Sequence, residues 1–145
     1  MELLINTETE SVAMRLLTKS VQSVIDKMNA GDILVFPEGK YVLSTVYLKS
    51  GITLRFEKGC EIFGSENFDD YDRDEKVGYP LYQDASHSFF HCSLFVGKNL
   101  ENIAIEGDGV IDMRSVWDEN NVRNMARRGA KCIALKNCKN VKLSG

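Results

Sequence analysis

The sequence contains no apolar run close to the roughly 20 residues that a membrane-spanning helix needs. Its formal net charge of -3 includes no basic excess, which argues against a general nucleic-acid-binding protein. The N-terminal MELLINTETE has neither the basic start nor the long apolar stretch of a signal peptide. We therefore expect no export, and a cytoplasmic location if the start shown is the natural one.

Cysteine is also scarce, with four residues among 145. They form no C-x-x-C pair and have no zinc-ligand spacing. Their neighbours are mostly apolar or turn residues, so we interpret them as small core or turn side chains outside disulfides and metal sites. The four are Cys60, Cys92, Cys132 and Cys138.

The N-terminal segment 1–30 has the pattern of an amphipathic helix. Thr7 and Glu10 have the spacing of a capping box, and Gly31 is a natural helix end. Between them, apolar residues recur at steps of three or four. These are Ala13, Leu17, Val21, Val24 and Met28.

Beyond Gly31 the sequence breaks into short apolar or alternating stretches, separated mostly by Gly, Asn or Lys, as strands and turns are. We predict ten short strands, which are typical of a sandwich, a barrel or a β-solenoid. They are Ile33–Phe36, Tyr41–Leu43, Val46–Leu48, Ile52–Phe56, Glu61–Phe63, Leu94–Val96, Ile103–Ile105, Val110–Asp112, Cys132–Leu135 and Val141–Leu143.

An internal repeat favours the solenoid. KNLENIAIEG at 98–107 returns as KNCKNVKLSG at 136–145, and a shorter version begins at Lys49. The distances between these three starts are unequal, and each is too long for one solenoid turn. Polar excursions at about 65–91 and 113–130 account for the excess, and without them each turn has about 22 residues, a length that stacks as a solenoid.

The repeat also predicts how the turns are arranged. Asparagine tolerates the left-handed backbone of a tight turn, so we expect Asn102 and Asn140 at turns. Stacking of the repeats would place Asn102 above or below Asn140. Both excursions follow the same strand of the repeat, so we expect them to emerge on one side of the stack. A binding groove could form there, since function concentrates in loops on a rigid scaffold.

Six segments in this order resemble the N-terminal third of the polygalacturonase-like glycoside hydrolases, family 28, in the pectin-lyase-like superfamily. They are TKSVQSVID (18–26), ILVFPEGKY (33–41), YLKSGITL (47–54), GSENFDDY (64–71), NIAIEGDGVID (102–112) and NCKNVKLSG (137–145). The length fits one domain, 1–145, and the resemblance implies a mainly β fold, a right-handed single-stranded parallel β-helix. Residues 1–30 would form its helical cap and 31–145 its first coils.

The resemblance also implies inverting hydrolysis of polygalacturonate or a related pectic chain by aspartates, with no cofactor. The family's catalytic segments, Asn-x-Asp, Asp-Asp, Gly-His-Gly and Arg-x-Lys, lie in later coils and cannot be placed here. We therefore expect the sequence to be a truncated N-terminal fragment, inactive by itself. An uncapped last coil would also favour self-association.

Several residues invite a catalytic or metal-binding interpretation that their context disfavours. Asp69 and Asp70 are adjacent, but they match the family's earlier loop and fit a solvated turn better. Asp112 ends a strand, where a carboxylate usually holds the next turn. His87 and His91 are four residues apart without an obvious third ligand, so we predict no metal site.

The second excursion is the best binding candidate. Met113–Lys131 carries five basic and two acidic residues, net +3, whereas Ser65–Gly78 has a net charge of -4. A polyanionic sugar would be attracted to the first and repelled by the second, and arginine matches carboxylate geometry well. The predicted substrate-binding residues are Arg123, Arg127, Arg128 and Lys131.

Three other functions remain open from the sequence. A calcium-dependent pectate-lyase-type eliminase shares the superfamily. A non-catalytic β-helix could bind carbohydrate without cleaving it. A purely structural β-helix, as in phage fibres, would do neither. Pectic polysaccharide or oligosaccharide is the expected partner, with no nucleic acid and no membrane.

Overall fold

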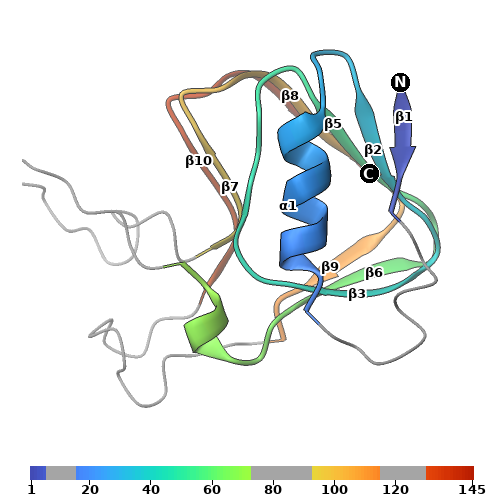
Figure 1. Cartoon of the computed structure of the whole chain (residues 1–145), viewed down its shortest axis with the longest axis vertical. Helices are drawn as coiled ribbons and strands as arrows, with labels where there is room; N and C mark the ends of the chain where they lie inside the picture. The colour runs from blue at the N-terminus through green and yellow to red at the C-terminus, as the bar shows by residue number, and fades with distance from the viewer. Residues whose placement is uncertain (6–15, 73–92, 115–129) are drawn as a thin grey trace, which may run out of the picture.

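A computed structural model describes residues 1–5, 16–72, 93–114 and 130–145, which wind into a parallel β-helix with three sheets (Figure 1). Sheet A contains β1 (Glu2–Leu4), β2 (Ile33–Phe36), β5 (Thr53–Phe56), β8 (Glu101–Gly107) and β11 (Lys139–Leu143). Sheet B contains β3 (Gly39–Leu43), β6 (Cys60–Gly64) and β9 (Val110–Asp112). Sheet C contains β4 (Val46–Tyr47), β7 (Ser93–Lys98) and β10 (Lys131–Lys136). Each of the ten predicted stretches overlaps one of these strands.

Strand register shows how the length of a coil changes along the stack. The first complete coil is short, since Ile33 pairs with Thr53. The next is the longest, because Thr53 pairs with Ala104, and the last is intermediate, because Glu101 pairs with Lys139. The two later coils contain the two excursions, which supply their extra length without disturbing the pairing of the strands.

The same turn occurs at the same place in successive coils, at the start of sheet A. Gly31, Gly51, Asn102 and Asn140 have φ angles of 92°, 80°, 59° and 53°. The side-chain Nδ2 of Asn140 donates to Oδ1 of Asn102 at 2.6 Å, which confirms the predicted stacking. Left-handed backbone costs least in glycine and asparagine, so these residue types fix the turn.

A second asparagine pair lies just before the first in the chain. Asn99 and Asn137 have φ angles of 57° and 53°, and Asn137 Nδ2 donates to Asn99 Oδ1 at 2.6 Å. We call Asn99, Asn102, Asn137 and Asn140 together the asparagine corner. It joins sheet C to sheet A.

The core consists of columns of apolar side chains inside the coils. Leu34 pairs in register with Leu54, and Leu54 with Ile105. The Phe36 and Phe56 rings stack with centroids 4.9 Å apart. These side chains are 7% exposed or less. Burying apolar surface at about 25 cal/mol per Å² makes this column the main source of stability.

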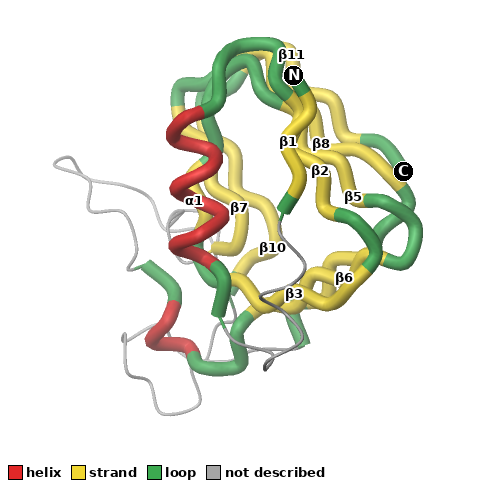
Figure 2. Tube along the Cα trace, turned by 45° about the vertical axis from the view of Figure 1, so that its right-hand side comes forward, coloured by secondary structure: helices red, strands yellow, loops and turns green. Residues whose placement is uncertain are grey.

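An amphipathic helix, α1 (Thr18–Lys27), lies across the N-terminal end of the stack (Figures 1 and 2). Its Val21 and Ile25 are fully buried in the core. The Lys49 ammonium donates to the carbonyl oxygens of Asp26 and Met28, at 3.2 and 2.8 Å, near the helix C-terminus. The helix therefore shields the apolar interior from water at this end.

The predicted helical cap over residues 1–30 is wrong at its start. Glu2–Leu4 form β1, which pairs with β2, and Leu16 bridges Val42 in an extended conformation. Backbone pairing with the first coil holds both segments extended, and the helix begins only at Thr18. Thr7 and Glu10 lie outside the described residues. No helix in the described part of the chain is long and apolar enough to cross a membrane.

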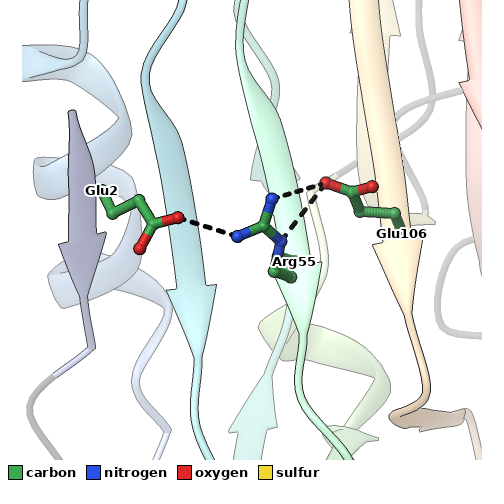
Figure 3. Close-up of polar contacts among 3 residues, drawn as sticks. All are labelled: Glu2, Arg55 and Glu106. Atoms are coloured by element: carbon green, nitrogen blue, oxygen red, sulfur yellow. Dashed lines mark hydrogen bonds and ion pairs between the residues drawn. The ribbon is translucent and has the colours of Figure 1, made fainter.

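Charged side chains link three strands on the outer face of sheet A (Figure 3). Arg55 on β5 donates to Glu2 on β1 at 2.8 Å and to Glu106 on β8 at 3.2 and 3.3 Å. These hydrogen bonds raise the pKa of Arg55 above its usual value.

At the other edge of the sheet, Val141 and Leu143 on β11 are 37% and 56% exposed. Self-association through this coil stays a prediction.

One side chain of α1 takes the place of a neighbouring strand. The Gln22 amide oxygen accepts from the Tyr47 N–H at 2.8 Å, and its Nε2 donates to the Tyr47 carbonyl at 3.0 Å. Tyr47 lies on β4, at one edge of sheet C. Gln22 therefore satisfies backbone groups that an edge strand leaves unpaired.

We expect Gln22→Ala to lower the free energy of unfolding by about 1–2 kcal/mol, because two backbone groups of Tyr47 lose their partner. Gln22→Glu should lose about half as much, since a carboxylate accepts from the N–H but cannot donate to the carbonyl. Urea denaturation measures both, with the exposed Lys19→Ala as the control. Equal stability of the Gln22→Ala variant and the unmodified chain would contradict the strand-substitute role.

Candidate functional site

Both excursions begin and end at one corner of the β-helix. The first leaves β6 and the second leaves β9, where Phe63 and Asp112 are register partners. The chain rejoins sheet C at Ser93 and at Lys131, which are also partners. The described starts and returns of the excursions therefore lie together, as the repeat predicted. We call residues 63–72, 112–114, 93 and 130–131 the excursion corner.

A short 3-10 helix, η2 (Phe68–Asp70), begins the first excursion. The Asn67 side chain caps it by accepting from the Asp69 N–H at 3.1 Å. Tyr71 is 2% exposed, and its hydroxyl donates to the Ser65 carbonyl at 2.9 Å. The Asp70 carboxylate binds the Ser65 hydroxyl. Asp69 and Asp70 therefore belong to a structured turn, as expected from the sequence.

The next residue of this segment fastens it to sheet C. The Tyr47 hydroxyl donates a hydrogen bond to the Asp72 carboxylate. The Asp72 N–H donates to the Thr45 hydroxyl at 2.9 Å. Partial burial, followed by the hydrogen bond to Asp72, raises the pKa of the Tyr47 phenol above its usual value. The phenol is therefore neutral and acts as a hydrogen-bond donor.

The second excursion begins with a turn that Asp112 holds. Its carboxylate accepts from the Arg114 N–H at 2.8 Å, as predicted for a carboxylate at a strand end. The Arg114 guanidinium lies 4.0 Å from the centre of the Phe63 ring and donates to Glu66 at 3.0 Å. Arg114 thus connects the starts of both excursions by a cation–π contact and an ion pair.

The described part of this corner is acidic. Two basic side chains, Arg114 and Lys131, stand among five carboxylates. These are Glu66, Asp69, Asp70, Asp72 and Asp112. Most of the carboxylates hold local structure rather than facing each other as an acid and base pair would. Within the described ranges, no group of three His, Cys, Asp or Glu residues could hold a metal ion.

One of the four predicted substrate-binding residues can be placed. Lys131 is half-buried at the start of β10, where the second excursion rejoins sheet C. Arg123, Arg127 and Arg128 lie outside the described residues, as do His87, His91 and Cys92. Substrate binding by the basic excursion therefore stays a prediction.

The cysteines in the described ranges behave as core and turn residues. Cys60 is 1% exposed in the core. Burial raises the pKa of the Cys132 thiol, which makes the thiolate scarcer. The Cys138 thiol donates at 3.4 Å to the Lys136 carbonyl. None of these environments resembles that of an activated nucleophile.

Sequence reasoning missed the Tyr47–Asp72 and Arg114–Phe63 contacts. Each joins residues far apart in the chain, so no spacing rule could reveal it. Arg114 also has a φ of 54°, which is uncommon for arginine and has no signature in the sequence. The sequence indicated these contacts only through the opposite net charges of the two excursions.

Two known proteins are similar in sequence to a large part of this chain, whereas no protein-family model matches it. Exo-poly-alpha-D-galacturonosidase from Dickeya chrysanthemi is 32% identical over 99 residues, covering 66% of this chain and 16% of that protein. Iota-carrageenase from Zobellia galactanivorans is 25% identical over 103 residues, covering 69% of this chain and 18% of that protein. The chain thus spans less than a fifth of the length of these relatives.

Solved structures share the fold over nearly the whole chain. The family 28 exopolygalacturonase of Yersinia enterocolitica superposes with a TM-score of 0.74 at 24% identity, covering 100% of this chain and 34% of that chain. Polygalacturonase from Erwinia carotovora ssp. carotovora superposes with a TM-score of 0.67 at 14% sequence identity. That match covers 98% of this chain and 39% of the polygalacturonase chain. The fold is therefore the parallel β-helix of polygalacturonases. The resemblance to polygalacturonase-like glycoside hydrolases is confirmed.

The raised pKa of Tyr47 predicts a pH dependence. A neutral phenol is favoured in the fold, so its contribution is complete below the unfolded pKa of about 10 and is lost as pH rises through the higher folded pKa. The unmodified chain should lose more stability between pH 8 and pH 11 than Tyr47→Phe. Urea midpoints at both pH values measure this, and parallel losses in the two proteins would contradict it.

Proposed function

We propose that this chain is part of a glycoside hydrolase that acts on polygalacturonate or a related pectic polysaccharide. The observation that carries the proposal is the 32% identity to an exo-poly-alpha-D-galacturonosidase over 99 residues. The match to a family 28 exopolygalacturonase over the entire chain supports it. In this proposal the chain supplies coils of the scaffold and a polyanion-binding surface.

Hydrolysis in the complete enzyme would be a single displacement. One aspartic acid protonates the leaving oxygen, and a second aspartate, whose carboxyl group lies about 6.5–9.5 Å from the first, activates water. Three carboxylates of the excursion corner already hold local structure: Asp70 binds Ser65, Asp72 binds Tyr47 and Asp112 holds the Arg114 turn. The family's catalytic segments belong to later coils, so we assign catalysis to no residue of this chain and expect the chain alone to be inactive.

Binding is assigned to the second excursion. Arg123, Arg127, Arg128 and Lys131 carry four positive charges within a short segment of the chain. Planar guanidinium groups match carboxylates in two-point contacts, so a galacturonate chain suits them. The acidic start of the first excursion would repel the same chain and confine it to the basic side.

A second substrate class has its own observation. The likeness to an iota-carrageenase covers 69% of this chain. Iota-carrageenan is therefore the alternative ligand, and a direct comparison of the two polysaccharides decides between them.

The test uses the purified chain with trigalacturonate, iota-carrageenan oligosaccharide and neutral maltotriose. We expect trigalacturonate to bind, and the triple variant Arg123→Gln, Arg127→Gln, Arg128→Gln to bind about tenfold more weakly, as loss of three exposed charge contacts implies. The triple variant Lys27→Gln, Lys40→Gln, Lys58→Gln removes the same charge elsewhere and should bind normally.

Three results would count against the proposal. Absence of trigalacturonate binding would contradict the polyanion-binding role. Stronger binding of the carrageenan oligosaccharide would replace the pectic substrate class. Release of reducing ends from polygalacturonate by the chain alone would contradict the assignment of catalysis to residues outside it.

A further inference from the structure

Arg114 is the exception among the left-handed residues of this β-helix. Within the described residues, five amino acids other than glycine have a positive φ, and the other four form the asparagine corner. Asparagine adopts this backbone at a lower cost than arginine does. The turn is held through the Arg114 N–H, which donates to Asp112, so it does not depend on the arginine side chain. The presence of arginine here therefore points to what its side chain does.

The Arg114 guanidinium is held on two sides by the start of the first excursion. It lies 4.0 Å from the centre of the Phe63 ring, and its Nη1 donates to Glu66 Oε1 at 3.0 Å. Phe63 follows the fully buried Ile62 on β6, so its ring lies on the outer face of sheet B. The side chain of Arg114 is 29% exposed. It is thus partly shielded from water, which strengthens both contacts.

The residue before Arg114 joins the two excursions on the core side. Met113 packs both on the main core and on the small cluster that Phe68 and Tyr71 form. Gly64 makes room for this contact. A Cβ at Gly64 would lie 2.6 Å from the Tyr71 hydroxyl oxygen and 2.9 Å from the Met113 sulfur. Side chains from the starts of both excursions therefore meet over a glycine.

Three kinds of contact thus fix the two excursion starts relative to each other. These are the pairing of β6 with β9, the apolar packing of Met113 and the contacts of the Arg114 guanidinium. Glu66 and Arg114 are 48 residues apart in the chain, so local sequence does not impose this arrangement. We call Phe63, Gly64, Glu66, Met113 and Arg114 together the junction.

We propose that Arg114 is a positioning residue for polyanion binding, which holds the start of the basic excursion against the start of the acidic one. This inference rests on the proposed function, in which the second excursion binds a uronate chain. The ion pair with Glu66 offsets the charge of Arg114, so Arg114 acts through the Phe63 ring and Glu66 rather than on the ligand. Binding is tighter because the junction orders the base of the excursion before the ligand arrives.

Variants of Phe63 test the positioning role without changing any charge. Phe63→Leu removes the aromatic face on which the guanidinium lies. We expect it to bind trigalacturonate about two- to fivefold more weakly, the size of an exposed cation–π contact. Phe63→Tyr keeps an aromatic face and should bind as the unmodified chain does. Titration calorimetry of the full chain measures the affinities, and urea denaturation shows that each variant is folded.

A double variant shows whether the Phe63 ring acts through Arg114. Arg114→Asn removes the guanidinium and keeps a residue type that tolerates the left-handed turn, so it should fold and bind about three- to tenfold more weakly. Phe63→Leu combined with Arg114→Asn should bind no more weakly than Arg114→Asn alone. Additive losses would mean that the Phe63 ring contacts the ligand itself, and would overturn the inference.

Amide hydrogen exchange tests the junction without any ligand. In the first excursion, the Asp70 N–H donates to the Asn67 carbonyl at 3.0 Å. Arg114→Asn should speed the exchange of this amide about two- to fivefold, because the first excursion loses its contact with the second. Unchanged exchange at Asp70 would show that the two starts are not joined through Arg114, and the inference would be wrong.

Failure of this inference differs from failure of the proposed function. If the unmodified chain does not bind trigalacturonate, the proposed function is wrong and the positioning role falls with it. If the unmodified chain binds and Phe63→Leu binds equally well, the proposed function stands and the positioning role is wrong. A loss of stability in Phe63→Leu with no loss of affinity would likewise reduce the junction to a structural contact.

Discussion

Close stacking of successive coils is the constraint on which the rest of the structure depends. A Cβ at Gly107 would overlap the carbonyl group of Phe56 in the coil beneath, and one at Gly51 would lie 2.8 Å from the Ala30 Cβ. Coils this close must turn at the same points, which is why left-handed residues recur at Gly31, Gly51, Asn102 and Asn140. The apolar columns of the core follow from the same register, because each inward side chain meets its counterpart in the next coil.

The two charged corners are consequences of this stacking. Insertions are tolerated where they leave the strand register intact, and both excursions leave from one corner for that reason. Arg114, Glu66 and Phe63 then join the two excursion starts. At the asparagine corner the chain turns without an insertion, so lysines on adjacent strands come into direct opposition. The rigid scaffold thus places the starts of both excursions at one end of sheet C and the asparagine corner at the other.

Much of this fold is predictable from the sequence because a solenoid repeats its local signals. The ten short stretches and the Asn102–Asn140 stacking follow from periodicity and turn chemistry alone. The N-terminal strand does not, since Glu2–Leu4 are fixed by pairing with β2 rather than by their own apolar spacing. The sites are harder to predict. Substrate binding by Lys131 is a prediction from charge counting, and the Lys98–Lys136 opposition depends on a strand register that the variable length of the inserts conceals.

The most direct test of the stacking account compares two glycine substitutions in chemical denaturation. Both Gly31 and Gly107 have left-handed φ angles, 92° and 112°, but a Cβ at Gly31 would meet no atom within 4 Å. Gly31→Ala should therefore cost only the backbone strain of about 1–2 kcal/mol. Gly107→Ala should cost about 3 kcal/mol or more, because the coils must separate. Equal losses in the two variants would contradict the claim that coil-to-coil contact governs this fold.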